Sequence, residues 1–270
     1  MYGVFHTAIS FNQSINNWNT SKVTTMSEMF RGATSFNQPI GNWDTSKVTT
    51  MKGMFYGATS FNQDLNNWNT SRVTTFYRMF YQATSFNGNI SSWNTGLVTD
   101  MAGMFQGAAN FNGNISAWNT SKVNTFSNMF NGAIAFNQDI SLWDVSKVTS
   151  MGQMFQSCTN FNQPLNTWNT SSCTYMNSMF YGANSFNQPI GNWNVSKVTN
   201  MVGMFYQATS FNQDISNWNV SSVNTATNMF FGVTFPTVVY DGILIKWSKQ
   251  ALQSGVTISF GNSKYSNGLP

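Results

Sequence analysis

Few side chains in this 270-residue sequence have the chemistry that catalysis requires. The sequence contains one histidine, His6, close to its first residue, and one glutamate, Glu28. A Ser–His–Asp or Cys–His system would have to use His6, and no HExxH, GxxxxGK or GxSxG motif is present. We therefore expect a protein that is not an enzyme and that holds no cofactor.

Aspartates recur at regular intervals but do not form pairs. Asp64, Asp139 and Asp214 share one repeat position, and coils spaced by about 4.8 Å would hold neighbouring members about 14 Å apart. Glycoside hydrolysis needs two carboxyl groups about 5–10 Å apart. We interpret these three as turn-forming residues. Asp44 and Asp144 alternate with asparagine, but the acidic density around them is too low for calcium, so we predict no metal site.

The two cysteines, Cys158 and Cys173, replace an alanine and a valine at repeat positions that we expect to point inward. One interpretation is a buried pair of small hydrophobic side chains. The other is a disulfide across one coil, which the occurrence of both cysteines within a single repeat length favours somewhat.

A 25-residue period organises the whole chain. Phenylalanine recurs without insertion or deletion at Phe5, Phe30, Phe55, Phe80, Phe105, Phe130, Phe155, Phe180, Phe205 and Phe230. The consensus reads MFxGAxSFNQxIxxWNTSKVTTMxx. Such a strict period predicts one structural coil per repeat, with the apolar residues of each coil buried against its neighbours. We predict a repeat solenoid with nine to ten 25-residue repeats over residues 1–232.

Within one coil, the spacing of Met51, Met54, Phe55 and Ala58 predicts one face of a short helix. The segment that follows, SFNQDLNNWNTS, is typical of one or two short strands joined by tight turns. Glutamine stands in the place of Gly57 in other coils, so we expect no obligatory left-handed glycine at that position.

Two repeat positions predict side-chain ladders along the stack. We interpret the asparagines as amides that bond to one another and to turn backbone. We interpret the tryptophans as a ladder at the edge of the core, with a strip of ligand-facing rings as the alternative. The asparagines are Asn12, Asn37, Asn62, Asn87, Asn112, Asn137, Asn162, Asn187 and Asn212, and the tryptophans are Trp18, Trp43, Trp68, Trp93, Trp118, Trp143, Trp168, Trp193 and Trp218.

Residues 233–270 leave the repeat pattern and predict a terminal cap, which a stack needs over its last open coil. Apolar spacing predicts a helix over about 240–250, and VTISF at 256–260 predicts a strand. The first residues show no comparable cap, and MYGVFHTAIS lacks the basic start and continuous apolar segment of a signal peptide.

The coils, with their Met-Phe and Phe-Asn-Gln motifs and a Trp followed by Asp or Asn, Thr or Val, and Ser, resemble the repeats of the BspA family of leucine-rich-repeat surface proteins. The tail YDGILIKWSKQALQSGVTISFGNSKYS is similar to the segment that often follows such repeats. The resemblance implies a leucine-rich-repeat-like solenoid on a cell or particle surface, used for adhesion and recognition, with no catalytic residues.

Composition narrows the classes of partner. Charged residues make up only 7% of the chain, against about 25% in a typical soluble domain. The net charge of +4 comes without a run of like charges, so we expect no nucleic-acid partner. No stretch approaches the ~20 apolar residues of a membrane span. A neutral surface rich in hydrogen-bonding groups is typical of secreted or particle-surface proteins.

Two exposed repeat positions are candidates for partner binding. A basic column follows the Thr-Ser or Val-Ser pair, and we interpret it either as a solvated face or as a weak attractant for anionic glycans. A tyrosine column follows Met-Phe, and we interpret it either as packing between coils or as a recognition surface. The basic column is Lys22, Lys47, Arg72, Lys122, Lys147 and Lys197, and the tyrosine column is Tyr56, Tyr81, Tyr181 and Tyr206.

These observations predict a structural and interaction protein, extracellular, on a cell surface or on a virus particle. Repeated shallow contacts along a rigid rod would bind a protein or glycan on another surface. The alternative is a structural component of a viral particle or extracellular filament, in which the partners are copies of the chain itself. Ice binding along the threonine column that includes Thr24 and Thr49 is a third, less favoured reading.

Overall fold

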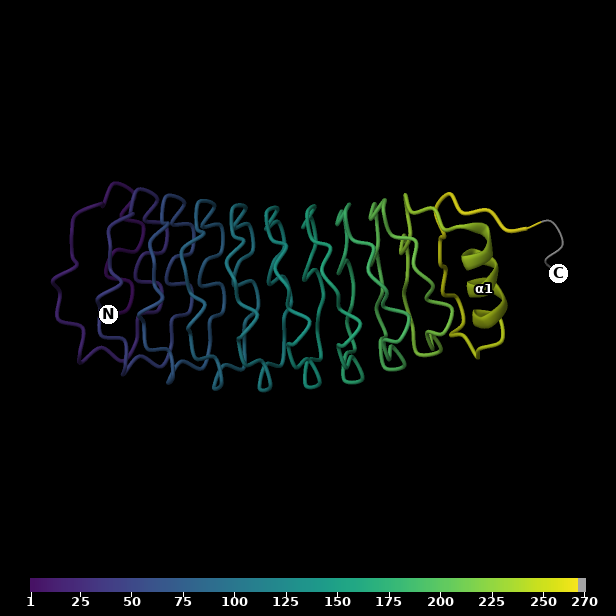
Figure 1. Ribbon diagram of the computed structural model, residues 1–270, viewed down its shortest axis with the longest axis horizontal. Coiled ribbons are helices and arrows are strands. Elements are labelled where there is room, and N and C mark those ends of the chain that lie inside the picture. Colours follow the sequence, from purple (N-terminus) through teal and green to yellow (C-terminus); the bar gives the residue numbers. More distant parts are fainter. Residues whose placement is uncertain (267–270) are drawn as a thin grey trace.

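The computed structural model describes residues 1–266, in which 25-residue coils stack along one axis with the first and last residues at opposite ends (Figure 1). Equivalent residues of successive coils form parallel β-bridges, among them Thr25 with Thr50 and Asp100 with Thr125. The chain is therefore a repeat fold in which like residues lie on like. The core runs along the axis, and its side chains come from every coil.

Helix α1, Thr237–Trp247, is the only α-helix in residues 1–266, and no strand in this range extends beyond an isolated bridge. The prediction of a short helix and a short strand in each coil is therefore wrong. The same periodicity did identify the buried residues, since Met51, Met54, Phe55 and Ala58 are inaccessible to solvent. Their backbone, however, follows a series of tight turns.

Left-handed backbone conformations explain why these segments are not helices. Gly53 and Gly57 have φ angles of 58° and 67°, and the equivalent residues of the other coils also have positive φ. A residue in this region interrupts an α-helix. The expectation that no left-handed glycine is obligatory at the Gly57 position is confirmed, because Gln82 and Gln207 both adopt a φ of 54° there.

Backbone hydrogen bonds in this turn segment alternate between two kinds. The amide of Met54 donates to the carbonyl of Met51 in the same coil, at 3.1 Å. The amide of Phe55 donates to the carbonyl of Met79 in the next coil, at 2.8 Å, and that of Gly57 donates to Tyr81 at 2.6 Å. Successive amides thus close a turn or join two coils, which satisfies backbone groups that burial would otherwise leave without a partner.

Aromatic rings fill the centre of the stack in continuous columns. Phe55 and Phe80 stack with 5.4 Å between ring centroids, and Phe55 stacks on Phe61 of its own coil at 4.0 Å. Trp68 and Trp93 stack at 6.3 Å with an interplanar angle of 1°. Parallel stacking at these separations is favourable for offset rings, and it repeats because each coil has the same cross-section.

The C-terminal segment covers the last coil (Figure 1). Helix α1 begins and ends three residues earlier than predicted, and it buries Ile243 and Trp247. The predicted strand at 256–260 is a single bridge between Ile258 and Ala226. The side chain of Gln250 accepts a hydrogen bond from the amide of Val220 at 2.7 Å and donates to a carbonyl at 2.8 Å. Residues 267–270 of the predicted cap lie outside the described residues.

Two glycine-to-alanine substitutions should change stability in opposite directions. Gly107 has a φ of 71°, and an added Cβ would lie 3.2 Å from Cγ of Gln82. Because L-residues are strained in this region, we expect Gly107→Ala to lower the free energy of unfolding by about 1–2 kcal/mol. Gly242 lies in α1 with no atom closer than 4.0 Å to an added Cβ, so Gly242→Ala should raise it by about 0.5–1 kcal/mol.

Chemical denaturation of the two variants beside the parent chain measures both effects. Equal effects of the same sign would show that the left-handed turns do not limit the stability of the coil.

Candidate binding surface

The asparagine ladder consists of side chain to backbone hydrogen bonds. Oδ1 of every asparagine from Asn12 to Asn187 accepts a bond from the backbone amide of the asparagine one coil later, at 2.9 Å for Asn12 and Asn37 and 3.1 Å for Asn187 and Asn212. Glutamine side chains donate to the same oxygens, as Gln163 does to Asn137 at 3.0 Å. The asparagine amides thus bond to backbone and to glutamine, whereas the sequence also led us to expect bonds from one asparagine amide to another.

The tryptophan column belongs to the core. Trp43 to Trp193 are 3–4% exposed and Trp218 is fully buried, whereas Trp18 in the first coil is 36% exposed. Nε1 of Trp68 donates to the carbonyl of Ile40 at 3.1 Å, and the other buried tryptophans of this column make the equivalent bond. Burial of both the ring and its N–H prevents contact with a ligand, so the buried tryptophans do not form the alternative ligand-facing strip.

Both cysteines are buried free thiols, so the possible disulfide between Cys158 and Cys173 is not formed. The Cys158 thiol donates to the carbonyl of Phe130 at 2.7 Å, and that of Cys173 to the carbonyl of Tyr175 at 3.4 Å. Desolvation raises the pKa of Cys173 to about 12 and raises the pKa of Cys158 still further. Thiols of this kind pack as small hydrophobic groups, because only the thiolate is a strong nucleophile.

The aspartates lie in turns. Oδ1 of Asp64 accepts a hydrogen bond from the amide two residues later at 2.8 Å, and Asp139 and Asp214 do the same. Hydrogen bonds from the hydroxyl and amide of Ser46 lower the pKa of Asp44, and Ser146 lowers the pKa of Asp144 in the same way. Among residues 1–266, no three His, Cys, Asp or Glu side chains gather where they could hold a metal ion.

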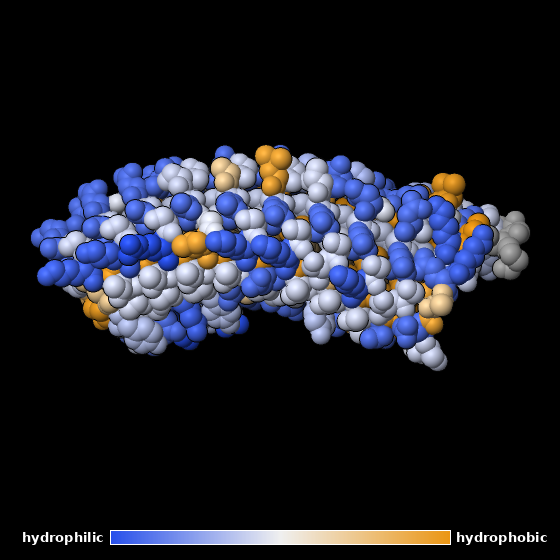
Figure 2. All heavy atoms as spheres, turned by 90° about the horizontal axis from the view of Figure 1, so that it is seen from below, coloured by the Kyte–Doolittle hydropathy of each residue, from blue (hydrophilic) through white to orange (hydrophobic). Residues whose placement is uncertain are grey.

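The basic column lies on the exposed side of the stack. Its six members are exposed, and no hydrogen bond or ion pair within the described range fixes their side chains. Leu97, which interrupts the column, is 43% exposed. The surrounding surface is mostly hydrophilic or near neutral, with small separate hydrophobic patches on the face shown in Figure 2. In residues 1–266, no helix combines the length and the apolar character needed to cross a bilayer.

The tyrosine column consists of stacked, half-buried rings. Tyr56 and Tyr81 stack with 4.3 Å between centroids, and Tyr181 and Tyr206 stack at 4.5 Å. Phe231 continues the second group at 4.7 Å from Tyr206. Desolvation raises the pKa of Tyr81, and the neighbouring Tyr56 adds to this effect. The rings thus pack between coils on their faces and remain partly accessible, so the two interpretations of this column are compatible.

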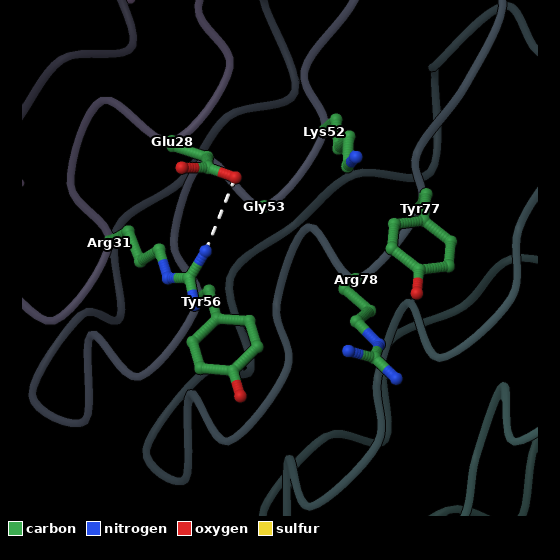
Figure 3. A pocket seen from close by; sticks show the side chains of 7 residues that line it. All are labelled: Glu28, Arg31, Lys52, Gly53, Tyr56, Tyr77 and Arg78. Atoms are coloured by element: carbon green, nitrogen blue, oxygen red, sulfur yellow. Dashed lines mark hydrogen bonds and ion pairs between the residues drawn. The ribbon is translucent and has the colours of Figure 1, made fainter. Parts of the chain in front are cut away.

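Beside the first tyrosine pair, charged and aromatic side chains line a hollow of 210 Å³ (Figure 3). Glu28 and Arg31 form an ion pair across it, with 3.3 Å between Oε1 and Nη1. The guanidinium carbon of Arg31 lies 4.6 Å from the ring centroid of Tyr56. The lining residues are Glu28, Arg31, Lys52, Gly53, Tyr56, Tyr77 and Arg78.

Tyr77 lies close to the two remaining cations of this hollow. Nζ of Lys52 is 5.3 Å and Cζ of Arg78 is 5.1 Å from its ring centroid, distances that allow cation–π attraction. Cζ of Arg78 is also 5.4 Å from the ring of Tyr81. Within residues 1–266 the side chains of Lys52 and Arg78 have no hydrogen-bond or ion-pair partner.

The repeat makes room for these long side chains. Glu28 and Arg78 occupy a left-handed position, with φ angles of 56° and 52°, and glycine occupies it in the coils that follow them. A Cβ on Gly103 would lie 3.1 Å from Cγ of Arg78, and one on Gly53 would lie 3.5 Å from Cγ of Glu28. Glycine in the next coil therefore leaves space for the side chain that crosses it.

Sequence reasoning missed Lys52, Tyr77 and Arg78 because it followed the repeat positions one at a time. The hollow is built from three repeat positions, those of Lys52, Gly53 and Tyr56, in three successive coils. A signal was present: these positions vary most between coils, and in the early coils they carry Glu28, Arg31, Lys52 and Arg78.

Comparison with known proteins identifies a family. The family model described as "Mycoplasma protein of unknown function, DUF285" matches residues 1–101, 86–177 and 138–240 in succession. These overlapping matches cover nearly all of the coils and agree with the tandem organisation seen in the structure. No curated protein matches the sequence.

Removal of one asparagine from the ladder should lower the stability of the fold. Asn137→Ala deletes the oxygen that accepts from the amide of Asn162 at 2.9 Å and from the side chain of Gln163. We expect the free energy of unfolding to fall by about 1–3 kcal/mol, because a partly buried amide loses its partner. Gln163→Ala removes only the second donor and should cost less than about 1 kcal/mol. Equal losses in urea titrations would contradict this ranking.

The lowered pKa values predict a small acid sensitivity. Stability from Asp44 and Asp144 is present above the ordinary pKa of 3.8 and is lost as the pH falls through the lowered folded-state values. Asparagine makes the same turn bond at Asn194, so Asp44→Asn with Asp144→Asn should remove this loss. Melting temperatures of parent and variant should agree near pH 7 and diverge below pH 3.8, with the variant higher. Parallel curves would contradict the assignment.

Proposed function

The chain belongs to this Mycoplasma DUF285 family, and we propose that it is a non-enzymatic interaction protein of a cell or particle surface. Its coils, in this proposal, are of the BspA leucine-rich-repeat type, because the Met-Phe and Phe-Asn-Gln motifs and a Trp, Asp or Asn, Thr or Val, Ser motif recur in them. The protein acts by adhesion or recognition through exposed side-chain columns on a rigid stack of coils.

The observation that carries this proposal is the fixed register of the exposed columns. Bridges such as Thr25 to Thr50 and the asparagine ladder hold each coil in the same register with the next, so equivalent exposed side chains form straight rows. A row of identical weak contacts binds a repetitive partner with high avidity, since each contact raises the effective concentration of the next. Rigidity adds to affinity because little conformational entropy is lost on binding.

The carboxylates and thiols of residues 1–266 have structural partners, which supports a non-enzymatic role. Asp64 and the equivalent aspartates accept turn hydrogen bonds, and Glu28 pairs with Arg31. Neither of the buried cysteine thiols is positioned as a nucleophile. The exposed groups that remain are hydroxyls, amides, tyrosines and cations, which recognise a partner by hydrogen bonds, ring contacts and charge.

Two other roles have less support. As a component of a particle or filament, the chain would associate with its own copies. In an ice-binding role the threonine column would have to order water, yet the hydroxyls of Thr49 and Thr74 donate to carbonyls of the preceding coil at 3.2 and 3.3 Å. We therefore favour the recognition of a protein or glycan on another surface.

The test is binding of the whole chain to arrays of glycans and of extracellular-matrix proteins. We expect retention on a repetitive partner, and at least ~10²-fold tighter binding to a polymer than to its short unit, because several columns engage at once. The variant Tyr181→Gln with Tyr206→Gln tests the tyrosine column, since the equivalent positions already carry Gln106 and Gln156. It should weaken binding at least tenfold.

Thermal melting of the variant confirms that a loss of binding does not reflect unfolding. Failure of the parent chain to bind any array member would contradict the proposal, as would equal affinity for polymer and unit. Light scattering that shows concentration-dependent polymers would instead favour the filament role.

A further inference from the structure

We propose that the hollows around Tyr77 form one groove that binds an anionic polysaccharide, with Lys52 and Arg78 contacting its carboxylate or sulfate groups. This inference deepens the proposed function and rests on it, because it names the ligand class and the part of the surface that recognises it. We call this feature the Tyr77 groove.

The groove extends beyond the hollow shown in Figure 3. A second hollow of 440 Å³ is lined by Lys52, Thr74, Thr75, Tyr77, Thr99 and Asp100, and a third of 220 Å³ by Tyr77, Arg78, Ala102, Gly103, Gln106, Ser127 and Asn128. Tyr77 borders all three hollows. The lining residues run from position 28 to position 128 and thus cross several coils along the axis of the stack, which fits an extended polymer better than a compact small molecule.

The charges of the lining residues indicate that the ligand is an anion. The first hollow has three cations, Arg31, Lys52 and Arg78, and one anion, Glu28, so its formal charge is +3 − 1 = +2. Glu28 pairs with Arg31, which leaves Lys52 and Arg78 without an acidic partner in residues 1–266. Asp100 in the second hollow adds one negative charge, so the whole groove has a formal charge of +3 − 2 = +1, and its carboxylate accepts a bond from the amide of Ala102 at 2.8 Å. Two free cations on either side of one tyrosine would pair with carboxylate or sulfate groups.

Tyrosine rings restrict the two arginine side chains of the groove. Arg31 and Tyr81 occupy the same repeat position as Tyr56, one coil before and one coil after it, and both stack against its ring. Arg78 lies against the rings of Tyr77 and Tyr81. A guanidinium stacked on a ring still presents its N–H edge, and its restricted freedom lowers the entropy lost when a ligand binds.

The lining groups favour a saccharide over other polyanions. Hydroxyls of Thr74, Thr99 and Ser127 and amides of Gln106 and Asn128 border the second and third hollows. Thr74 and Thr99 donate their hydroxyl protons to carbonyls of the preceding coil, so their oxygens are left to accept hydrogen bonds from a ligand. The amide groups of Gln106 and Asn128 can donate, so the lining offers both the donors and the acceptors that sugar hydroxyls require. Nucleic acid is bound through many phosphate contacts and needs a denser array of cations than two free side chains supply.

The fold does not require the cationic side chains of the groove. Other coils place Ala102 at the position of Lys52, Gly103 at that of Arg78 and Gln106 at that of Arg31. Arg78 also adopts a φ of 52°, where an L-residue other than glycine is strained by about 1–2 kcal/mol. A cation at a position that the backbone would more easily give to glycine is consistent with a role in binding.

The experiment compares the double variant Lys52→Ala with Arg78→Gly against a matched control, Lys249→Ser with Lys264→Ser, two exposed lysines of the C-terminal segment that lie outside the basic column and do not line the groove. The groove substitutions introduce residues that the chain already carries at the same repeat positions, as in Ala102 and Gly103, and each variant removes two positive charges. Whole chains are titrated by calorimetry with a polyuronate oligosaccharide, a sulfated oligosaccharide and a neutral glucan of equal length.

We expect the parent chain to bind one or both anionic oligosaccharides and not the glucan, with affinity that falls as salt is added. The groove variant should lose at least tenfold in affinity and the control less than threefold. The groove variant should melt at the same or a higher temperature than the parent, because glycine relieves the strain at position 78. A preference for the sulfated or the carboxylated oligosaccharide identifies the anion.

Several results would overturn the groove. Equal losses in the two variants would show attraction by net charge alone, and equal binding of the glucan would exclude a role for the cations. Duplex DNA that competes as well as the oligosaccharide would point to a general polyanion surface. If neither anionic oligosaccharide binds while the arrays of proteins and glycans still retain the chain, the groove assignment fails and the proposed function stands. If neither the oligosaccharides nor any array member binds the chain, the groove assignment and the proposed function are both contradicted.

Discussion

Hydrogen bonding between equivalent positions of successive coils is the constraint on which the rest of this structure depends. Alternate amides of the turn segment, such as that of Phe55, reach a carbonyl of the next coil, and each ladder asparagine accepts from the amide of the next. A shift of one residue in any coil would break these bonds and move buried rings to the surface. The absence of insertions and deletions over the coils follows directly, because any of them would impose such a shift.

This constraint divides each coil into two kinds of position. Positions that face the next coil, such as those of Phe55, Asn137 and Trp68, are nearly uniform because each must fit its own copy above and below. Positions that face solvent, such as those of Lys52 and Arg78, are free to differ. Stability therefore depends on the uniform positions, whereas the recognition that we propose uses the exposed ones, which is why the groove variants should retain the fold.

The repeat predicted the stacked architecture and the buried residues, but it did not predict the local backbone conformation. The spacing of Met51, Met54, Phe55 and Ala58 correctly identified a buried face and wrongly predicted a helix, because a row of tight turns places side chains inward at similar intervals. Glutamine at positions 82 and 207 concealed the left-handed conformation that glycine marks elsewhere. The bonds between coils stabilise that conformation in residues that would rarely adopt it alone.

The sequence by itself determined the coil length, the stacking of like on like and the identity of the core residues, because a strict period leaves only one way to bury so many aromatic side chains. Tertiary structure alone decided that Cys158 and Cys173 are separate thiols. It also decided that Lys52 and Arg78 meet at Tyr77. The physical reason is that these contacts join different positions of different coils, and their distances depend on how the turns direct each side chain across the stack.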